Sequence, residues 1–333
     1  MNYQKNKKKI FIIAEAGVNH NGKINLAKKL VSKAKWAGAD AVKFQTYDYK
    51  LNYNVKYTNP KTISWAKKLT LSEKNLIKLK KYCEKKKIEF MSTAFDIKSA
   101  DFLNKIGMKK FKISSSGIFN IPLVKFISKL EKPIFLSTGM CKINDIQFSI
   151  KNLKKKKLCL LYCVSLYPSK YSDFDLTKIT SLRKAFDVPV GFSDHSPGID
   201  LAIASVGFGA KVIEKHIMLD KKIIYPDSKV SIIPKEFKKM VCSIRNLEKS
   251  IGDGKLKIMK KELSSRKKLT HGFYYNNNFK KGHILKKKDV ILLKPSGKIP
   301  IENYHKLLNS VLLRNVNKMN EILPKEIRFK SAK

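Results

Sequence analysis

The feature that most constrains the fold is a rhythm repeated over roughly the first 250 residues: an apolar segment, a loop and an amphipathic helical pattern. Strands that alternate with helices in this way are joined by parallel crossovers. Eight such units in about 250 residues predict a closed (β/α)8 barrel rather than an open sheet. No Gly-x-Gly-x-x-Gly motif follows the first expected strand, which argues against a dinucleotide-binding sheet. The expected strands are Ile10–Ala16, Asp40–Thr46, Ile88–Thr93, Lys110–Ser115, Pro133–Thr138, Leu158–Ser165, Val188–Ser193 and Lys211–His216. The expected helices include Ile24–Trp36, Ser72–Lys86, Ser99–Lys105, Pro122–Lys129, Phe174–Ala185 and Ile199–Phe208.

The rhythm ends near Leu247, and a second, smaller domain is expected beyond it. A turn-rich junction at Ile251–Gly254 leads into a lysine-rich connector. Short β-like pieces then follow at Gly272–Tyr275, Val290–Leu293 and Ser310–Val316. We therefore expect a (β/α)8 barrel over residues 1–258 and a small β-rich domain over residues 262–333.

The net charge of +45 does not in itself indicate a nucleic-acid partner. Only five of the 71 basic residues are arginine, whereas bidentate contacts to bases and phosphates favour arginine. The lysines are spread along every expected helix, which favours a solvated lysine coat over a basic binding stripe. We therefore expect no specific nucleic-acid partner. A polyanion-binding protein stays as an alternative, and it predicts DNA binding that falls steeply with salt.

Three absences in the sequence predict a cytoplasmic protein without membrane contact. No run of about 18 apolar residues occurs anywhere in the chain. The basic and then apolar N-terminal stretch meets Glu15 too early to form the core of a signal peptide. The five cysteines are odd in number and lack paired spacing, which argues against a disulfide framework or a zinc ribbon and fits a reducing compartment.

Polar residues gather at the carboxyl-terminal ends of all eight expected strands. In a (β/α)8 barrel these ends converge above a packed interior and carry the active site. A single serine at a strand end usually caps a helix, but eight polar ends together are difficult to assign to capping. The candidate site residues on these ends are Glu15, Lys43, Gln45, Thr93, Lys112, Ser115, Ser137, Ser165, Tyr167, Ser193, His195, Glu214 and His216.

His195 and His216 are expected at the ends of adjacent strands, so that their imidazoles converge on one point. Each shares its pleat face with a polar residue two positions earlier, Ser193 and Glu214 respectively. Two imidazoles with open coordination positions suit Mn²⁺, Zn²⁺ or Fe²⁺, with water or substrate oxygens completing the shell. The pair predicts a divalent metal site, and the alternative is that one of them is a hydrogen-bonded structural histidine.

Lys43 and Lys112 are expected to point inward from the barrel wall, although most lysines of the chain belong to helices. Burying an ammonium group without a partner is costly, so an anion is expected beside them. Hydroxyl groups of Thr93, Ser115, Ser137 and Ser193 are placed to donate to the same anion, which indicates a phosphate together with a carboxylate. Two alternatives remain: a lysine that forms a Schiff base, and lysines that reach outward from a strand of different register.

Eight short strings, in the same order along the chain, resemble the sialic acid synthase family, the phosphoenolpyruvate-condensing enzymes that make nine-carbon acidic sugars. The strings are AEAGVNHNG from Ala14, AVKFQT from Ala41, STAFD from Ser92, FKISSS from Phe111, LSTGM from Leu136, CVSLYP from Cys163, VGFSDHSPGI from Val190 and VIEKH from Val212. The segment after the barrel resembles that family's antifreeze-like (SAF) domain, with Gly282 and Pro295-Ser296-Gly297 in matching places. The family includes pseudaminic and legionaminic acid synthases.

The resemblance implies a reaction, a cofactor and a quaternary structure. The reaction condenses phosphoenolpyruvate with an open-chain N-acetylated hexose, either N-acetylmannosamine or a related amino or diamino sugar. Water is consumed, and the products are a nonulosonic acid and phosphate. His195 and His216 would ligate the metal, Mn²⁺ first, with Mg²⁺ or Co²⁺ as alternatives. A domain-swapped homodimer would place the small domain of one chain over the barrel of the other.

The resemblance also implies a role for each candidate residue. The residues around phosphoenolpyruvate would be Lys43, Thr93, Lys112, Ser115, Ser137, Ser165 and Ser193. The catalytic candidates are Glu15, Glu214 and Asp227, which would surround the sugar or transfer protons. Gln45, Tyr167 and Lys294 would complete the set that binds substrate.

Three positions depart from the family's pattern. The usual Gly-Ser-Gly followed by an acid, after the fourth-strand lysine, reads Ser114-Ser115-Ser116-Gly117, so the acid is absent. The usual Gly-Pro-Asp-His reads Tyr225-Pro226-Asp227-Ser228, and the final serine is more like pseudaminic acid synthases. Lys294 stands where the small domain usually presents an arginine, and a lysine keeps the charge without the planar fork. The resemblance therefore leaves the sugar open, and it also leaves the native metal open.

Overall fold

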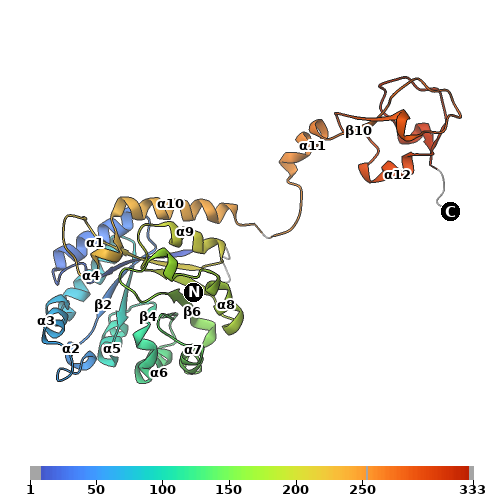
Figure 1. Cartoon of the computed structure of the whole chain (residues 1–333). Helices are drawn as coiled ribbons and strands as arrows, with labels where there is room; N and C mark the ends of the chain where they lie inside the picture. Colours follow the sequence, from blue (N-terminus) through green and yellow to red (C-terminus); the bar gives the residue numbers. More distant parts are fainter. Residues whose placement is uncertain (1–8, 253, 330–333) are drawn as a thin grey trace. The chain divides into compact units, whose positions relative to one another are not determined.

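The computed structural model describes residues 9–252 and 254–329. Eight parallel strands pair in sequence order, and β1 pairs with β8 to close a barrel (Figure 1). The strands are β1 (Phe11–Gly17), β2 (Ala41–Thr46), β3 (Glu89–Ala94), β4 (Phe111–Ile113), β5 (Ile134–Ser137), β6 (Leu158–Cys163), β7 (Val190–Asp194) and β8 (Val212–Ile217). A short strand, β9 (Ser231–Ile232), pairs with the end of β8. The predicted (β/α)8 barrel is confirmed.

A helix follows each barrel strand and packs on the outside of the wall. These helices are α1 (Ile24–Trp36), α4 (Glu73–Lys85), α5 (Ile97–Lys105), α6 (Ile121–Lys129), α7 (Ile143–Ile150), α8 (Thr177–Phe186), α9 (Asp200–Gly207) and α10 (Pro234–Ser250). Two further helices, α2 (Tyr49–Asn52) and α3 (Pro60–Leu69), lie in the connection after β2. Helix α1 shows why they pack so: its buried residues Ala27, Leu30, Val31 and Ala34 recur at the spacing that forms one apolar face.

Some elements differ from the sequence expectation. Strand β4 ends at Ile113 rather than Ser115, because the Ser114 hydroxyl accepts a hydrogen bond from the Gly117 amide and turns the chain into a 3-10 turn at Ser116–Phe119. Strand β6 ends at Cys163 rather than Ser165. Helices α3, α7 and α10 were not among the expected helices. In α7 the exposed residues Ile143 and Phe148 blur the apolar periodicity that marks a surface helix.

Apolar side chains fill the barrel below the strand ends. Buried Ile13, Met91, Phe135, Leu161 and Val212 belong to this inner cluster, which forms the floor of the barrel interior. A second and larger apolar layer lies between the strands and the helices. Because the interior is plugged from below, the polar strand ends face a closed-bottomed space rather than a pore.

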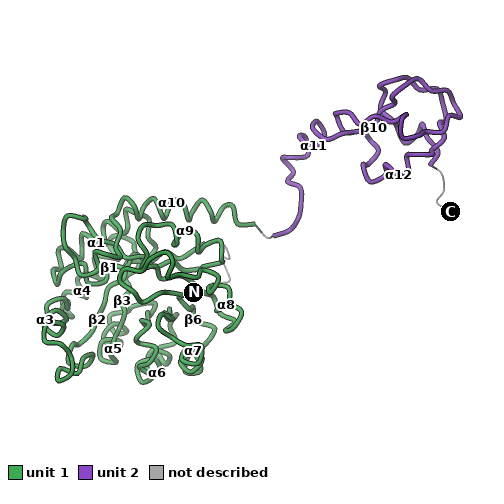
Figure 2. Tube along the Cα trace, viewed as in Figure 1, with its two compact units in different colours: residues 1–252 green, residues 253–333 purple. Residues whose placement is uncertain are grey.

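The second compact unit spans residues 253–333, and the first spans residues 1–252 (Figure 2). The predicted boundary, between residues 258 and 262, lies a few residues inside the second unit. This unit contains α11 (Leu263–Leu269), β10 (Gly272–Tyr275), β11 (Val290–Leu293), α12 (Tyr304–Leu307), β12 (Val311–Leu312) and β13 (Ile327–Arg328). The predicted strands at Gly272–Tyr275 and Val290–Leu293 are confirmed and pair antiparallel. The predicted strand Ser310–Val316 is only two residues long, Val311–Leu312.

A small apolar core of its own holds the second unit together, with Phe273, Tyr275, Leu285 and Leu312 among its buried residues. Three parts of the sequence expectations fall outside the described residues: Asp253 of the turn-rich junction, the N-terminal stretch 1–8 and the last residues 330–333. In the parts of the chain that the structure describes, no helix has both the length and the apolar character that spanning a membrane requires.

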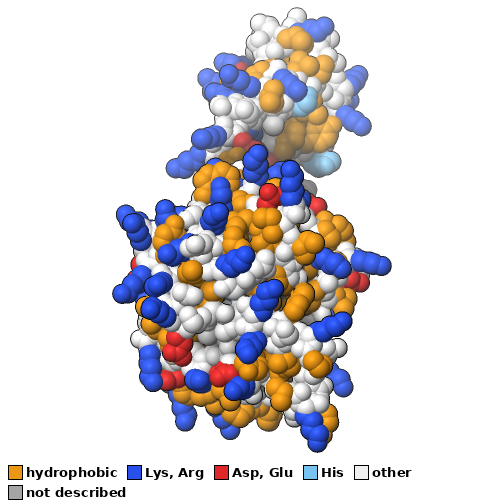
Figure 3. Space-filling view, turned by 90° about the vertical axis from the view of Figure 1, so that its left-hand side faces the viewer, with side chains coloured by type: hydrophobic (Ala, Val, Ile, Leu, Met, Phe, Trp, Pro, Cys, Tyr) orange, Lys and Arg blue, Asp and Glu red, His pale blue; other side chains and the backbone are white. Residues whose placement is uncertain are grey.

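Lysine and arginine side chains are scattered over the visible face of the molecule (Figure 3). Acidic and apolar side chains lie between them, and no continuous basic stripe crosses this face.

Candidate active site

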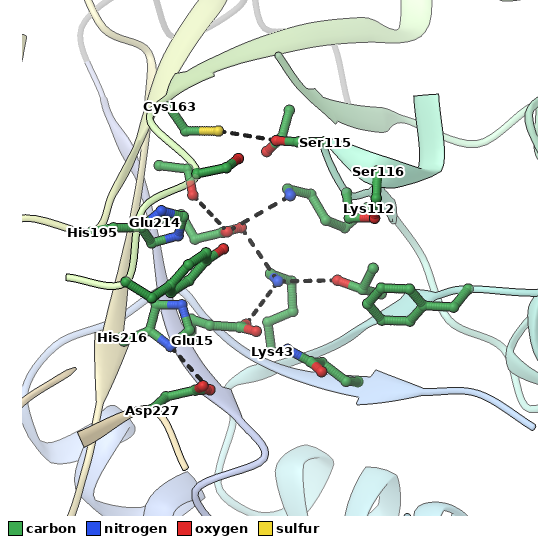
Figure 4. Close-up of a pocket in the computed structure, with 18 of the residues that line it drawn as sticks. Glu15, Lys43, Lys112, Ser115, Ser116, Cys163, His195, Glu214, His216 and Asp227 are labelled. Carbon is green, nitrogen blue, oxygen red and sulfur yellow. Dashed lines mark hydrogen bonds and ion pairs between the residues drawn. The ribbon is translucent and has the colours of Figure 1, made fainter. Parts of the chain in front are cut away.

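The carboxyl-terminal ends of the barrel strands surround a cavity of about 410 Å³ (Figure 4). Every candidate residue of the barrel unit lines this cavity: Glu15, Lys43, Gln45, Thr93, Lys112, Ser115, Ser137, Ser165, Tyr167, Ser193, His195, Glu214, His216 and Asp227. Lys294 is exposed in the second unit and is not one of the lining residues. The cavity is further lined by Phe95, Ser114, Ser116, Met140 and Cys163, which the sequence did not single out as site residues.

Strand register explains why these side chains meet. Glu15 of β1 lies opposite Lys43 of β2 on one side and His216 of β8 on the other. Ser193 of β7 lies opposite Glu214 of β8. Since alternate residues of a strand face the same side, these residues point into the barrel, while their sequence neighbours face the helices.

Two lysines and two glutamates form a buried charged cluster at the base of the cavity (Figure 4). Lys43 Nζ lies 2.7 Å from Glu15 Oε2 and 3.5 Å from Glu214 Oε2, and it donates a hydrogen bond to Thr93 Oγ1 at 3.1 Å. Lys112 Nζ lies 3.7 Å from Glu214 Oε1. The sequence predicted that an anionic ligand would partner these lysines, but the protein itself supplies two carboxylates. Lys112 keeps the looser contact and has more capacity to bind an additional anion.

The pKa values of the two buried carboxyl groups are shifted in opposite directions. Burial raises the pKa of Glu15, and Lys43 offsets this only in part. Burial acts in the same direction on Glu214, but Lys112 and Lys43 outweigh it and lower the pKa to about 2. Ser193 Oγ also donates a hydrogen bond to Glu214 Oε1 at 3.0 Å, which favours the ionised form. Glu214 is therefore a permanent anion, and Glu15 is the carboxyl that more readily holds a proton.

The pKa values of Lys43 and Lys112 are also shifted in opposite directions. Burial disfavours the charged form of Lys43, but the carboxylates of Glu15 and Glu214 outweigh burial and hold its pKa above the usual value. For Lys112 burial dominates and lowers the pKa, because only Glu214 lies close enough to oppose it strongly.

The two histidines converge as predicted, with ring centroids 5.4 Å apart. His195 Nδ1 lies 2.7 Å from the Val164 carbonyl oxygen, so Nδ1 carries the proton and donates it, and Nε2 is left as a free base. Burial, together with His216, lowers the pKa of His195 to about 3, which keeps the ring neutral. For His216 burial also disfavours the charged form, but Asp227, 3.4 Å from Nδ1, outweighs it and raises the pKa.

The donor set fits a divalent metal ion in kind. His195 has a tautomer fixed by a backbone carbonyl, which is the usual arrangement of a metal-binding imidazole. No hydrogen bond between described residues occupies Nε2 of either ring. Among the residues that the structure describes, no group of three or more His, Cys, Asp or Glu side chains is placed to enclose a metal. An ion here would take two nitrogens from the protein and its remaining ligands from water or substrate oxygens.

The loop after β8 brings Asp227 to the cavity, and residues that the sequence did not flag hold it there. Asn19 Oδ1 accepts a hydrogen bond from the Asp227 amide at 3.1 Å, and its Nδ2 donates to Ser231 Oγ at 2.9 Å. Ser231 Oγ donates in turn to the Asp227 carbonyl at 2.7 Å. Gly17 (φ +51°) leaves the necessary space, because a Cβ there would lie 2.5 Å from Asp227 Oδ2. The signal for Asn19 was its place directly after the first strand end.

Hydroxyl and thiol groups line the wall beside Lys112. Ser115 Oγ accepts a hydrogen bond from the Gly139 amide at 3.0 Å and lies 3.2 Å from Cys163 Sγ. Ser137 is almost fully buried, and its hydroxyl has no hydrogen-bond partner among the described residues. A buried hydroxyl without a partner is costly, so it marks a place where a ligand acceptor is expected.

Two of the three departures from the family pattern, at Gly117 and Ser228, lie in the barrel unit, and the third, Lys294, belongs to the second unit. Gly117 stands where the family pattern has an acid, and it does not line the cavity. Ser228 Oγ accepts a hydrogen bond from the Tyr225 amide at 2.7 Å and so shapes the turn that carries Asp227.

Tyr167 lies with its ring centroid 4.3 Å from that of His195, at the exposed rim of the cavity.

A closed barrel of eight parallel strands, with a polar cavity at their carboxyl ends, defines a TIM-barrel protein with the layout of an enzyme. The chain belongs to the NeuB family, whose sequence model matches residues 30–256. It is 38% identical over 324 residues to N,N'-diacetyllegionaminic acid synthase of Campylobacter jejuni, covering 92% of this chain and 97% of that protein. It is 35% identical over 324 residues to pseudaminic acid synthase of the same species, covering 93% and 94% respectively.

Solved structures give the same result. The crystal structure of N-acetylneuraminic acid (sialic acid) synthetase from Leptospira borgpetersenii, in complex with citrate, matches with a TM-score of 0.74. The two sequences are 35% identical, and the match covers 77% of this chain and 90% of that chain. The family resemblance drawn from the eight strings is thereby confirmed.

Proposed function

We propose that this chain condenses phosphoenolpyruvate with the aldehyde of an open-chain N-acetylated amino or diamino hexose, releasing phosphate and a nonulosonic acid. The proposal rests on one observation: Lys112, the unpartnered Ser137 hydroxyl and the convergent pair His195 and His216 all line the same cavity. Membership of the NeuB family and the synthases named among the relatives support it. Those relatives act on different sugars by their names, so the sugar is narrowed only to this class.

The proposed reaction consumes only phosphoenolpyruvate, the sugar aldehyde and water. Carbon 3 of phosphoenolpyruvate attacks the aldehyde carbon, and the aldehyde oxygen takes up a proton as the new C–C bond forms. Water adds to carbon 2 and loses a proton. The bond between carbon 2 and the phosphate oxygen then breaks, phosphate leaves with the electron pair and the remaining hydroxyl proton, and carbon 2 becomes a ketone.

Basic and hydroxyl groups of the chain would hold the charges of phosphoenolpyruvate. Lys43 and Lys112 would face its phosphate and carboxylate, with Thr93, Ser115 and Ser137 donating hydrogen bonds. These donors act within a buried site, where fixed charges stabilise a leaving phosphate more strongly than in water. Ser165 and Ser193 would complete the anion site, and Gln45, Tyr167 and Asp227 would contact the sugar.

We assign the proton transfers to Glu15 rather than Glu214. Glu15 holds a proton more readily, so it would supply the proton to the aldehyde oxygen and recover one from the attacking water. Glu214 stays ionised between the two lysines and fixes their positions. Two carboxyl groups whose environments separate their pKa values commonly divide such roles.

His195 and His216 would hold a divalent metal ion, Mn²⁺ first with Mg²⁺ or Co²⁺ as alternatives. When bound, the ion would polarise the sugar aldehyde as a Lewis acid. The chain's own contribution is to fix the tautomer of His195 through Val164, to keep that ring neutral by burial, and to orient His216 through Asp227.

A panel of N-acetylated amino and diamino hexoses, each incubated with phosphoenolpyruvate and Mn²⁺, tests the proposal. We expect phosphate release with at least one sugar, a product mass equal to that of a nonulosonic acid, and loss of both signals on chelation. Phosphate release without any condensed product, or no reaction with every sugar in the panel, would contradict it.

A Schiff-base aldolase is the second candidate, and the environment of Lys112 favours it. Burial lowers the pKa of this lysine and so favours the neutral amine that such chemistry needs. Borohydride trapping with pyruvate distinguishes the two reactions. A covalent adduct on Lys112 would support the aldolase, whereas a chelator-sensitive reaction without an adduct supports the synthase.

We further propose that the second unit is an antifreeze-like domain that covers the barrel cavity of a partner chain in a homodimer. Lys294, exposed directly after β11, would then enter the partner's sugar site. The family resemblance supports this arrangement.

A further inference from the structure

Directly behind the two histidines, on the outer face of the barrel wall, lies an ion pair that the proposed chemistry does not use. Lys215 Nζ and Asp194 Oδ2 are 2.9 Å apart, and both side chains are 0% exposed. Asp194 directly precedes His195, and Lys215 directly precedes His216. The two residues are register partners across β7 and β8.

Ser196 closes this pair into a small network. Asp194 Oδ1 accepts hydrogen bonds from the Ser196 amide at 2.8 Å and from its hydroxyl at 2.6 Å. Lys215 Nζ donates a second hydrogen bond to the Ser196 carbonyl oxygen at 2.5 Å. The residues on both sides of His195 are therefore tied to the residue directly before His216.

Burying two full charges costs free energy, and a well-packed apolar pair at the same place often stabilises a protein equally well. The contribution of this ion pair therefore lies in the geometry that it specifies. Here it fixes the strand end that carries His195 relative to the strand that carries His216. Alternation along the strands places the charged pair outside the wall and the imidazoles inside, so the pair acts on the histidines without entering the cavity.

We infer that Asp194, Ser196 and Lys215 are positioning residues that set the spacing of the two histidines and so tune the affinity of the cavity for a divalent metal ion. This inference rests on the proposed metal site, and it adds three residues to that site which contact neither substrate nor metal. Their role is to hold the 5.4 Å ring separation before any ligand binds.

Mn²⁺ binding to the full-length chain, stripped of metal and free of both substrates, tests the inference by isothermal titration. The key variant is the double substitution Asp194→Asn with Lys215→Met, because it leaves no uncompensated charge in the wall. We expect it to bind Mn²⁺ at least ten-fold more weakly. Ser196→Ala keeps both charges and removes one hydroxyl, and we expect a smaller loss, of a few-fold.

Glu89 and Lys110 provide the matched control, since their ion pair joins the residues at the start of β3 and before β4, at the opposite end of the barrel. Glu89→Gln with Lys110→Met makes an equivalent chemical change there and should leave Mn²⁺ affinity within two-fold. Circular dichroism and tryptophan fluorescence verify that each variant is folded during the titration. If the key variant is unfolded, the Mn²⁺ affinity of Ser196→Ala alone tests the inference.

Wild-type Mn²⁺ affinity in the folded key variant, or an equal loss in the control, would overturn the inference. Failure of the proposed reaction looks different. A wild-type chain that binds Mn²⁺ but condenses no sugar would contradict the proposed function and leave this inference standing. Condensation by a wild-type chain that binds no Mn²⁺ would contradict this inference and leave the proposed condensation standing.

Discussion

His20 illustrates how one buried side chain makes the barrel sensitive to acid. It is 1% exposed, and its Nδ1 accepts a hydrogen bond from the Gly22 amide at 3.1 Å. Burial lowers its pKa from 6.5 to about 4, although Asp227 opposes the shift. Because the folded state disfavours the proton, this part of the stability is complete above pH 6.5 and is lost as the pH falls towards 4. The loss is on the order of 3 kcal/mol.

His20→Gln should therefore make the free energy of unfolding less dependent on pH between 6.5 and 4 than in the wild type. Urea unfolding followed by tryptophan fluorescence measures this for the barrel alone, because Trp36 and Trp65 both lie in the first unit. His271→Gln, at an exposed histidine of the second unit, is the control and should keep the wild-type pH dependence. Equal pH dependence in His20→Gln and the wild type would contradict the argument.

Lys112 allows a test of the anion site. Lys112→Met removes the cation that has only one carboxylate, at 3.7 Å, so the variant should raise the KM for phosphoenolpyruvate at least ten-fold, about 1.4 kcal/mol. The sugar KM should change much less. Lys110→Met is the control, because Lys110 pairs with Glu89 outside the cavity. Steady-state phosphate release measures both constants, and a change confined to the sugar KM would move Lys112 out of the phosphate site.

At this scale the sequence predicted which side chains face the cavity, but not their partners. Alternation along the strands was enough to place Lys43 and Glu214 inside. The pairing of Lys43 with Glu15 depends on the register of β1 against β2 in a closed barrel, which local pattern does not encode. Asn19 lies only two residues after β1, yet its hydrogen bonds to Asp227 and Ser231 join positions more than 200 residues apart.

At the scale of elements, the connection after β5 shows how a loop shapes the anion site. A Cβ at Gly139 would collide with Ser165 Oγ and would lie 2.9 Å from both Cys163 Sγ and Ser115 Oγ. Gly139→Ala should therefore displace these side chains and raise the KM for phosphoenolpyruvate about ten-fold or more, while the barrel stays folded.

Gly207→Ala is the matched control for this loop, since a Cβ there at the end of α9 meets nothing within 4 Å. It should leave both Michaelis constants and the unfolding midpoint nearly unchanged. Phosphate-release kinetics and thermal unfolding make the comparison. An unchanged KM in Gly139→Ala would show that the wall beside Lys112 adapts without cost to binding.

The elements that the sequence predicted well were those with a clear period. The barrel strands are apolar segments bounded by turn residues, and α1 repeats its apolar positions every three to four residues. Prediction failed where local side-chain bonds or mixed faces override the period. Ser114 ends β4 early, and the exposed Ile143 and Phe148 of α7 conceal its buried face.

For the whole molecule, the sequence predicted two units because the rhythm of strands and helices stops near Leu247. The exact division was less accessible, since the connector resembles neither neighbour in composition. The charge of +45 bears on association rather than on architecture, and the expected lack of a specific nucleic-acid partner stays a prediction. How two copies combine depends on surfaces rather than on patterns, so it stays a prediction.

Complementation between two defective chains tests the proposed cap. A truncated chain of residues 1–258 keeps the cavity residues but lacks Lys294, whereas full-length His195→Ala keeps the second unit but lacks a metal ligand. Each alone should condense sugar poorly. Mixed in equal amounts and allowed to exchange, they should recover about a quarter of full-length activity, since half of randomly formed dimers are mixed and each holds one complete site.

The control mixture pairs the truncated chain with full-length His195→Ala that also carries Lys294→Ala. It should recover much less, because Lys294 is the residue that the cap would bring to the sugar. Phosphate release measures every mixture, and tryptophan fluorescence verifies that the truncated barrel is folded. If the truncated chain alone turned over sugar at the full-length rate, the second unit would not complete the site. If the control mixture recovered as much as the first, the cap would act without Lys294.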